Sequence, residues 1–272
     1  MIKVAIIGWG YVGKGMGKLF EDRVDVIYDP FNPEIKSDEK SKAQVNACDL
    51  AVVCVPTQPN PDQSCNTSIV EETIGWLETP LILIKSTIEP GTTKRLVEKT
   101  GKKIAFSPEY MGEGKYFIPP WRYPDPLDPK KHTFVIVGGE RETTKPIVDI
   151  FTRIMGPHVT YAQTDSTTAE LVKYMENMWI GTKVVWSNEM YNVCEALGVD
   201  YREARELWSL DPRVDKMHTA VFPDARGFGG KCIPKDNRGL IRVSQKHGYD
   251  PKFLKEVINS NARMRKEEDT ID

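Results

Sequence analysis

Cysteine, histidine and excess charge of either sign are all scarce in this sequence of 272 residues. Five cysteines at irregular spacing, with no CxxC pair among them, argue against the disulfide framework of a small secreted protein. The four histidines do not cluster with cysteines at zinc spacing, so we expect no structural metal. A net charge of −2 argues against nucleic acid or an anionic membrane as the main partner.

Long apolar runs are also absent, and none approaches the ~18 residues of a membrane-spanning helix. The first residues, MIKVAIIGWG, do not show the charged, apolar and cleavage regions of a signal peptide in that order. We therefore expect a cytoplasmic protein with no membrane partner. The length favours about two domains.

The first half of the sequence alternates short apolar runs with longer stretches of helical character. The runs are rich in Val and Ile and nearly continuous, as in strands that a parallel sheet buries on both faces. Alternating strands and helices predict an α/β fold, here an N-terminal Rossmann dinucleotide-binding domain over residues 1–163. We expect strands at 3–7, 24–28, 50–55, 81–84, 104–106, 134–137 and 159–161, and helices at 12–21, 67–77 and 90–99. Residues 148–155 are expected to close the last helix of this domain.

The second half predicts a small all-α domain over residues 164–272 that acts as a central, dimerisation domain. Residues 165–197 contain no proline, and Gly181 is their only glycine, so we expect one long helix. Thr167 and Glu170 match a capping box at its start. Its apolar residues cover more than one face, which predicts burial on several sides and the spine of a homodimer. Shorter helices are expected at 201–210, 235–247 and 251–265.

A GxGxxG pattern, Gly8 to Gly13, follows the first expected strand and opens the first expected helix. Its glycines permit a tight turn, close approach of a pyrophosphate and packing of helix on strand, and the helix N-terminus adds amide donors. Asp29, 21 residues after Gly8, is placed to bind the adenine-ribose hydroxyls, and its charge would repel a 2′-phosphate. The predicted cofactor is therefore NAD, bound by Gly8, Gly10, Tyr11, Val12, Gly13 and Asp29.

A second glycine-rich motif, GFGGKCIPKD at 227–236, surrounds a cysteine with residues that do not form a packing stripe. The three glycines permit close approach of a ligand to the backbone. Lys231 and Lys235 favour the nucleophilic thiolate form of Cys232. The other cysteines are predicted to be buried in apolar context or exposed in a polar loop: Cys48, Cys54 and Cys194 buried, Cys65 exposed.

Lys173 and Asn177 lie four residues apart on the expected long helix and therefore share one face. A partly buried Lys–Asn pair can hold a developing oxyanion. The alternative is a lysine that extends along the surface beside an exposed asparagine, and the sequence leaves both open. The sequence also leaves two interpretations open for the proline-rich segment 119–129, PPWRYPDPLDP. It is either a lid over a site or a stiff surface loop.

Together these features resemble the UDP-glucose/GDP-mannose dehydrogenase family, most closely its UDP-glucose 6-dehydrogenases, from residue 1 to about residue 265. Six motifs occur in the family's order. Besides the two glycine-rich motifs they are KSTIEPGT at 85–92, similar to KSTxPxGT, SPEYMGEG at 107–114, similar to SPEFLREG, AELVK at 169–173 with Asn177, and DPR at 211–213. The resemblance implies oxidation of the primary alcohol of a sugar nucleotide, with UDP-glucose the expected substrate, to the uronate by two NAD.

The resemblance also implies catalytic roles for the matching residues. Cys232 is the nucleophile, which holds the substrate first as a thiohemiacetal and then as a thioester. Lys173 and Asn177 stabilise the oxyanion of the thiohemiacetal. Asp236, directly or through water, or Lys173 takes the proton of the substrate hydroxyl.

Thr87, together with Glu109 or Glu113, is implied to orient the water that hydrolyses the thioester. The NAD site is implied to include Thr57, Thr87, Glu113 and Lys235. The implied substrate contacts are Glu109, Tyr110, Met111, Gly112, Glu113, Lys173, Asn177, Arg213, Val221, Phe222, Pro223, Asp224, Ala225 and Gly229. Among these, Arg213 is expected to reach the substrate of a neighbouring subunit.

The sequence departs from the family in three places. The resemblance ends before the family's third part, a second Rossmann-like domain that holds much of the nucleotide. Gly112 stands where the family has arginine, and 119–129 is longer than the family's loop. Trp121, Arg122 and Tyr123 in that loop are therefore candidates to stack on the nucleotide and pair with it.

Two other functions stay open. A single-oxidation 3-hydroxyacid dehydrogenase shares the Rossmann domain, the long helix and a Lys-x-x-x-Asn pair, but needs no thiol nucleophile. The chain is alternatively the NAD-binding subunit of a split enzyme whose nucleotide-binding domain is a separate polypeptide.

Overall fold

The computed structural model describes residues 2–111, 128–268 and 270–271. The chain divides into two compact units, residues 1–58 with 65–173 and residues 59–64 with 174–272. The first unit contains a seven-stranded sheet and the helices that cover it. Its strands are β1 (Val4–Ile7), β2 (Val24–Tyr28), β3 (Leu50–Val53), β4 (Leu81–Ile84), β5 (Ile104–Phe106), β6 (Phe134–Gly138) and β7 (Thr160–Thr164). Its helices are α1 (Tyr11–Phe20), α2 (Glu39–Asn46), α3 (Ser68–Trp76), α4 (Thr92–Thr100) and α5 (Arg141–Met155), with short 3-10 turns at Glu21–Arg23 and Pro129–Lys131.

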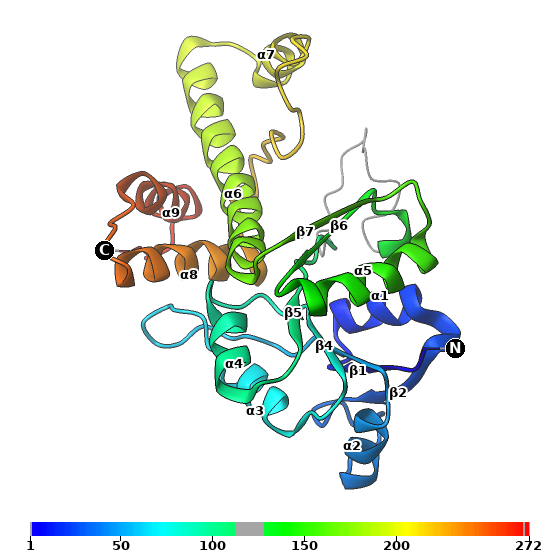
Figure 1. Cartoon of the computed structure of the whole chain (residues 1–272). Helices are drawn as coiled ribbons and strands as arrows, with labels where there is room; N and C mark the ends of the chain where they lie inside the picture. The colour runs from blue at the N-terminus through cyan, green and yellow to red at the C-terminus, as the bar shows by residue number, and fades with distance from the viewer. Residues whose placement is uncertain (1, 112–127, 269, 272) are drawn as a thin grey trace. The chain divides into compact units, whose positions relative to one another are not determined.

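The sheet has the order β2-β1-β3-β4-β5-β6-β7, and each neighbouring pair is parallel except β5 with β6. Side chains of α1 and α5 pack on one face of the sheet, and side chains of α2, α3 and α4 pack on the other. Figure 1 shows α1 and α5 together on their side of the strands. The predicted Rossmann arrangement, a sheet wound on both faces, is therefore confirmed.

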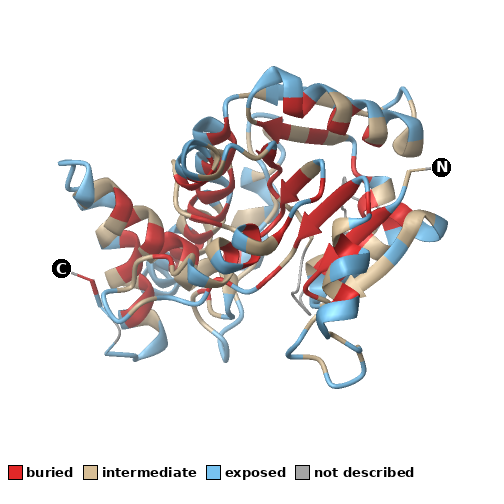
Figure 2. Cartoon of the chain, turned by 60° about the horizontal axis from the view of Figure 1, so that its bottom comes forward, coloured by how far each residue is buried: buried red, intermediate tan, exposed pale blue. Residues whose placement is uncertain are grey.

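The core of this unit lies on both faces of the sheet because successive strand side chains point to opposite faces. In β1, Ala5 and Ile7 join the cluster beneath α2, α3 and α4, whereas Val4 and Ile6 join the cluster beneath α1 and α5. Figure 2 shows central strands buried along their length and helices exposed on their outer sides. Two-sided burial explains why these strands are continuous apolar runs in the sequence.

The carboxyl ends of β1, β3, β4 and β5 form one edge of the sheet. The register aligns their last residues, and the residue after each strand donates its N–H to the neighbouring strand, at 2.7 Å for Cys54, 2.8 Å for Lys85 and 2.9 Å for Ser107. From β1 the chain moves to β2 on one side, and from β3 onward it moves to the other side, so the strand order reverses between β1 and β3. Sheets of this kind bind their ligands outside the carboxyl ends of the strands, next to this reversal. The edge therefore brings together the glycine turn after β1 and the segments that begin at Cys54, Lys85 and Ser107.

The second unit is built from helices in the part of the chain that the structure describes. These are the continuation of α6 (Ser166–Leu197) from Tyr174 onward, α7 (Tyr201–Trp208), α8 (Cys232–Lys246) and α9 (Lys252–Arg265). A Cβ on Gly181 would lie 2.5 Å from Nδ2 of Asn237 and 3.2 Å from the Phe228 ring. Glycine at this position therefore lets α8 pack closely against α6, as part of the predicted all-α arrangement.

Three helices differ from the sequence prediction. Helix α2 was not predicted, because it is short and polar and buries only Ser41 and Val45. Helix α5 ends at Met155, as predicted, but it begins at Arg141 and continues through Pro146, which the sequence did not indicate. Helix α8 begins at Cys232 rather than at 235, because Pro234 lies in its first turn, where a missing N–H breaks no helical hydrogen bond.

The predicted capping box at the start of α6 is wrong. Asp165 takes that role: its Oδ1 accepts the N–H of Thr168 at 2.9 Å, and its Oδ2 accepts the Thr168 hydroxyl at 2.6 Å. The carboxylate of Glu170 instead accepts the N–H groups of Gly91 and Thr93, at the start of α4.

Neither a metal site nor a membrane span is found within the described ranges. They contain no cluster of three or more His, Cys, Asp and Glu side chains that is suited to a metal ion. None of their helices has the length and apolar character needed to cross a membrane.

Candidate active site

In the turn after β1, two glycines, Gly8 and Gly13, lie at positions where a side chain would collide with the backbone. Gly8 has a φ of +89°, and a Cβ there would lie 2.5 Å from the carbonyl oxygen of Cys54. A Cβ on Gly13 would meet the Gly8 carbonyl, whereas one on Gly10, the N-cap of α1, would have nothing within 4 Å. The turn therefore packs tightly on the sheet and leaves the N-terminus of α1 accessible, which fits the pyrophosphate of a dinucleotide.

Asp29, next to this turn, has two backbone partners. Its Oδ2 accepts the N–H of Trp9 at 2.8 Å, and its Oδ1 accepts the N–H of Phe31 at 3.0 Å. Each oxygen of a carboxylate can accept a second hydrogen bond, so the ribose hydroxyls of NAD still fit this group. Asp29 thus also fixes the glycine turn, a role that the sequence did not suggest. Tyr11 is 61% exposed and Val12 is half-buried in the first turn of α1.

Thr87 is half-buried in the segment between β4 and α4, and two side chains hold its carbonyl oxygen. The Thr57 hydroxyl donates to it at 2.7 Å, and the Cys65 thiol donates at 3.6 Å. Cys65 is 8% exposed, so the prediction of a surface thiol is wrong. Its polar neighbours in the sequence gave no sign of a hydrogen bond 22 residues away.

The other cysteines outside the motif at 227–236 are structural. Cys48 and Cys194 are buried, as predicted, whereas Cys54, which was also expected to be buried, is half-buried. Burial raises the pKa of the Cys48 thiol to about 11 and that of Cys54 to about 12. Both therefore stay protonated at neutral pH and make poor nucleophiles.

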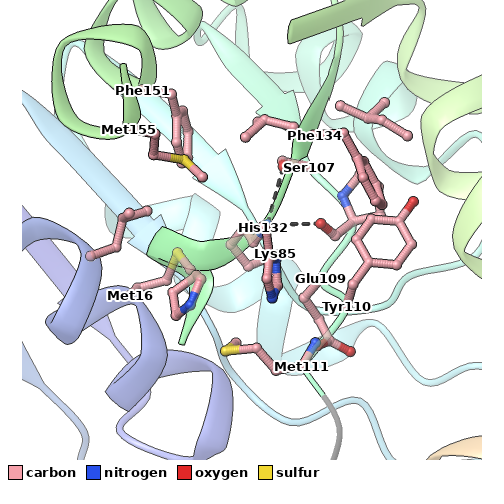
Figure 3. Close-up of a pocket in the computed structure, with 15 residues that line it drawn as sticks. Met16, Lys85, Ser107, Glu109, Tyr110, Met111, His132, Phe134, Phe151 and Met155 are labelled. Carbon is pink, nitrogen blue, oxygen red and sulfur yellow. Dashed lines mark hydrogen bonds between the residues drawn. The ribbon is translucent and has the colours of Figure 1, made fainter. Parts of the chain in front are cut away.

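Lys85, the first residue after β4, is a buried lysine whose role the sequence did not reveal. Its side-chain Nζ donates to the Ser107 hydroxyl at 3.1 Å and to the Pro108 carbonyl at 2.8 Å (Figure 3). Burial lowers its pKa to about 8, although the charge of Glu109 acts in the opposite direction. Lys85 therefore anchors the segment after β5 to the end of β4.

Glu109, in that segment, forms a buried ion pair with Lys173 of α6, with 3.1 Å between Oε1 and Nζ. The second oxygen of Glu109 accepts the N–H of Met111 at 2.9 Å, and Nζ of Lys173 lies 5.6 Å from the centre of the Tyr110 ring. The structure thus brings Lys173 together with three of the predicted substrate residues. Lys173 and Asn177 are only 5% and 4% exposed, so the alternative of a surface lysine beside an exposed asparagine is wrong.

A small cavity lies beside this segment, lined by Lys85, His132 and mostly apolar side chains (Figure 3). Its volume of about 30 Å³ accommodates roughly a single water molecule and is too small for a sugar. The Met111 sulfur is one of its walls and packs where a side chain on Gly15 of α1 would lie. The cavity therefore belongs to the packing behind the segment and is not a substrate pocket.

In the second unit, the predicted nucleophile and an acid–base group share the first turns of α8. Cys232 is the first residue of the helix and is half-buried, and Asp236 follows one turn later with 2% exposure. Nδ2 of Asn177 donates to Oδ2 of Asp236 at 2.6 Å, and Nζ of Lys235 lies 2.6 Å from Oδ1. This end of α8 therefore carries a thiol and a carboxylate that an amide and an ammonium group hold in place.

The glycine-rich loop before Cys232 is attached to α9. Asn261 accepts the Phe228 N–H at 2.7 Å and donates to the Phe228 carbonyl at 3.0 Å. A Cβ on Gly227 would lie 2.5 Å from Oδ1 of Asn261, and one on Gly229 would lie 3.0 Å from the Arg265 guanidinium. Gly227, which has a φ of +71°, is thus needed by packing within the unit, and the sequence interpretation, based on ligand approach alone, did not anticipate this.

The remaining predicted substrate residues lie in loops. Arg213 is largely exposed and pairs with Asp211, and residues 222–225 are exposed next to a half-buried Val221. Gly112, Glu113 and residues 119–127 of the proline-rich segment lie outside the described residues. The sequence analysis assigned no role to two positioning side chains, Lys85 and Asn261. Lys85 did give a signal, because it opens the KSTIEPGT motif directly after an apolar strand.

Comparison with known proteins agrees with this geometry. The chain is 31% identical over 186 residues to UDP-glucose 6-dehydrogenase of Rickettsia prowazekii (strain Madrid E), a match that covers 66% of this chain and 40% of that protein. A UDP-glucose dehydrogenase from Pyrobaculum islandicum superimposes with a TM-score of 0.83 at 25% identity, covering 98% of this chain and 69% of the other. The chain thus spans less than half of the Rickettsia relative.

The fold is shared more widely. A 3-hydroxyisobutyrate dehydrogenase from Mycobacterium tuberculosis superimposes with a TM-score of 0.69 at 15% identity, covering 100% of this chain and 96% of the other. Family models are more specific: the NAD binding domain of the UDP-glucose/GDP-mannose dehydrogenase family matches residues 29–152, and its central domain matches residues 167–263. Residues 29–152 are therefore an NAD-binding domain, and the chain belongs to the UDP-glucose/GDP-mannose dehydrogenase family.

Proposed function

We propose that the chain catalyses the NAD-dependent, four-electron oxidation of the primary alcohol of a sugar nucleotide, UDP-glucose or a close analogue, to the carboxylate. The observation that carries the proposal is the start of α8, where Cys232 and Asp236 lie one turn apart and Asn177 and Lys235 bind the carboxylate. A single oxidation of an alcohol requires no thiol. A thiol beside a held carboxylate suits capture of an aldehyde.

NAD, when bound, accepts a hydride in each of two steps. We assign its diphosphate to the glycine turn of Gly8, Gly10 and Gly13 with Tyr11 and Val12, and its adenine ribose to Asp29. On the basis of family resemblance, Thr87 and Glu113 are assigned to its nicotinamide end, and Thr57 and Lys235 are assigned as further contacts of the cofactor. The fit of the glycine turn and the free lone pairs of Asp29 support these assignments.

The residues of the chain handle protons and the carbonyl carbon. Asp236, directly or through water, or Lys173 takes the hydroxyl proton as the alcohol loses its first hydride. The Cys232 sulfur then bonds to the aldehyde carbon, and the carbonyl oxygen becomes an oxyanion. Lys173 and Asn177 stabilise that oxyanion, and their burial strengthens the interaction because little water competes.

Loss of a second hydride converts the thiohemiacetal into a thioester. Water attacks the thioester carbon, the carbon–sulfur bond breaks, and the thiol and the carboxylate are released. We assign orientation of this water to Thr87 with Glu109 or Glu113. Over the whole reaction one alcohol, one water and two NAD give one carboxylate, two NADH and three protons.

We assign the sugar nucleotide to Glu109, Tyr110, Met111, Lys173 and Asn177. The remaining assigned contacts are Gly112, Glu113, Arg213, Val221, Phe222, Pro223, Asp224, Ala225 and Gly229. In this proposal residues 1–163 act as the dinucleotide-binding domain and residues 164–272 as the central domain. A cytoplasmic location fits the supply of both NAD and sugar nucleotides.

We also propose that the chain forms a homodimer through α6. Large apolar side chains on this helix are exposed, at 58% for Met175, 57% for Trp179 and 72% for Leu197. Trp186 and Trp208 stack nearby with ring centres 4.8 Å apart and are themselves partly exposed. Sedimentation of wild type and Trp179→Glu tests this: we expect a dimer and a monomer, and a monomeric wild type would refute it.

The proposed oxidation is tested by the yield of NADH per UDP-glucose consumed, for wild type, Cys232→Ser and Cys194→Ala. We expect two NADH for wild type and for the Cys194 control, and a sharp loss of turnover in Cys232→Ser. One NADH per turnover that does not depend on Cys232 would contradict the proposal and favour a 3-hydroxyacid-type dehydrogenase. Tight NAD binding without turnover of any sugar nucleotide would instead favour a subunit that needs a separate nucleotide-binding chain.

A further inference from the structure

Glu170 is a buried carboxylate that the proposed reaction does not use. It lies in the first turns of α6 with 0% exposure. Its Oε2 accepts the N–H of Gly91 at 2.6 Å, and its Oε1 accepts the N–H of Thr93 at 2.8 Å. The two acceptor bonds join parts of the first unit that are 79 and 77 residues apart in the sequence.

The N-terminus of α4 needs this carboxylate because its own cap has no side chain. Gly91 is the N-cap, with a φ of +95° and no capping hydrogen bond from a side chain. The first N–H groups of a helix have no partner within the helix, and the helix dipole makes this end positive. Glu170 supplies both the acceptors and the opposite charge from another helix, so the interaction is charge-assisted.

The two hydrogen bonds of Glu170 join two parts of the chain that carry assigned catalytic groups. Gly91 ends the segment that starts at Lys85 and contains Thr87, and Glu170 is three residues before Lys173 on α6. We propose that Glu170 is a positioning residue that fixes the turn of α6 carrying Lys173 against the segment carrying Thr87. This inference rests on the proposed oxidation for its effect on turnover, but not for its effect on structure.

Protonation of Glu170 should weaken its hydrogen bonds to the N–H groups of Gly91 and Thr93. Burial raises the pKa of Glu170 to about 7, and the charge of Asp165 raises it further. Arg95 of α4 forms its ion pair with Glu71 and interacts more weakly, as an opposite charge, with Glu89 and Glu170. A protonated carboxyl group points an O–H at one of the two N–H groups, as the NH2 of a glutamine would. The wild type at low pH should therefore resemble Glu170→Gln.

The test combines Glu170→Gln with Glu98→Gln, which removes the same charge from an exposed position on α4. At pH 8 we expect Glu170→Gln to lower kcat about tenfold, with the KM for NAD changed less than twofold, because the glycine turn is untouched. At pH 6, where about a tenth of Glu170 is ionised, the two enzymes should differ only about twofold. Glu98→Gln should match the wild type at both pH values.

Backbone amide NMR of the full chain tests the positioning role of Glu170 independently of any enzymatic activity. In the wild type, the Thr87 and Lys173 amide signals should titrate together with those of Gly91 and Thr93, with one midpoint near pH 7. Glu170→Gln should shift all four signals, and Glu98→Gln should shift none of them. Unmoved Thr87 and Lys173 signals, or an unchanged kcat for folded Glu170→Gln, would overturn the positioning role. A wild type inactive on sugar nucleotides would refute the proposed function only, because the titration still tests Glu170.

Discussion

Replacing Lys85 with methionine should separate the stability of the protein from its activity. Lys85 is 6% exposed, and burial lowers the pKa of its ammonium group from 10.5 to about 8. At pH 7 this lower pKa corresponds to about 3 kcal/mol by which folding disfavours the charged form. Methionine removes that penalty but leaves the Pro108 carbonyl without this donor, which costs about 1–3 kcal/mol. The two effects oppose each other, so the free energy of unfolding at pH 7 should change by less than about 2 kcal/mol.

Activity should respond differently, because Lys85 anchors the segment that carries Glu109. Without the anchor, the partner of Lys173 is free to move, and displacements of about 1 Å in a catalytic constellation can cost as much as 100-fold in rate. We expect kcat to fall at least about tenfold in Lys85→Met. Lys102→Met is the matched control, since Lys102 also makes two hydrogen bonds, to the carbonyls of Ile74 and Gly75, but lies outside the assigned site.

The pH dependence of stability gives a second measurement of the same group. Between pH 8 and 10.5 the unfolded chain keeps the Lys85 proton while the folded chain releases it, so the stability of the wild type rises with pH. Guanidinium unfolding at pH 7 to 10 should show the wild type gaining up to about 3 kcal/mol over Lys85→Met. A difference that stays constant with pH, or a wild-type rate of NADH formation in Lys85→Met, would refute this account of Lys85.

Three further changes test other contacts. Asp29→Ala should weaken NAD binding at least about tenfold by calorimetry, because it removes both the ribose acceptor and the partner of the Trp9 N–H; unchanged affinity would exclude Asp29 from the site. Asn177→Ala should lower the free energy of unfolding by about 1–3 kcal/mol, since the buried Asp236 carboxylate loses a donor at 2.6 Å, and a neutral change would mean that water replaces the amide. For Glu170 the pKa in the folded chain, about 7, lies above the usual 4.5, so between pH 4.5 and 7 the folded chain binds a proton that the unfolded chain has lost. The free energy of unfolding of the wild type, relative to Glu170→Gln, should therefore fall by up to about 3 kcal/mol from pH 4.5 to 7 and then stay level. A rise over this range would contradict the burial of this carboxylate.

The strands of the first unit could be predicted from the sequence because two-sided burial leaves a continuous apolar run. The clearest example is LILI at β4, which the structure places at 81–84, as predicted. Helix α2 has no such signature, since only Ser41 and Val45 are buried and its cap is Asp38 with Ser41 rather than Glu or Gln. The long helix α6 was predicted from the absence of proline, and the structure ends it at Leu197, before Gly198.

The contacts that hold the candidate site could not be predicted, because their partners are distant in sequence and mostly backbone atoms. The pattern at Thr167 and Glu170 fits a local capping box, but the Glu170 carboxylate binds N–H groups of Gly91 and Thr93 instead. The same holds for Asn261, whose side chain binds both backbone groups of Phe228 across 33 residues. Nearly every residue type offers a backbone N–H group, so a sequence motif cannot identify which one a side chain will bind.

These contacts share a physical logic that bears on function. Burying a charge is unfavourable unless hydrogen bonds or opposite charges compensate, and apolar residues of similar volume often give equal stability. In the first unit Lys85, Glu109 and Glu170 nevertheless bury charge, and each binds backbone groups of a segment that bears an assigned catalytic or substrate residue. We therefore infer that these charges fix the backbone of those segments rather than add to the stability of the fold. If that is correct, variants such as Lys85→Met should be harmless to folding and harmful to turnover.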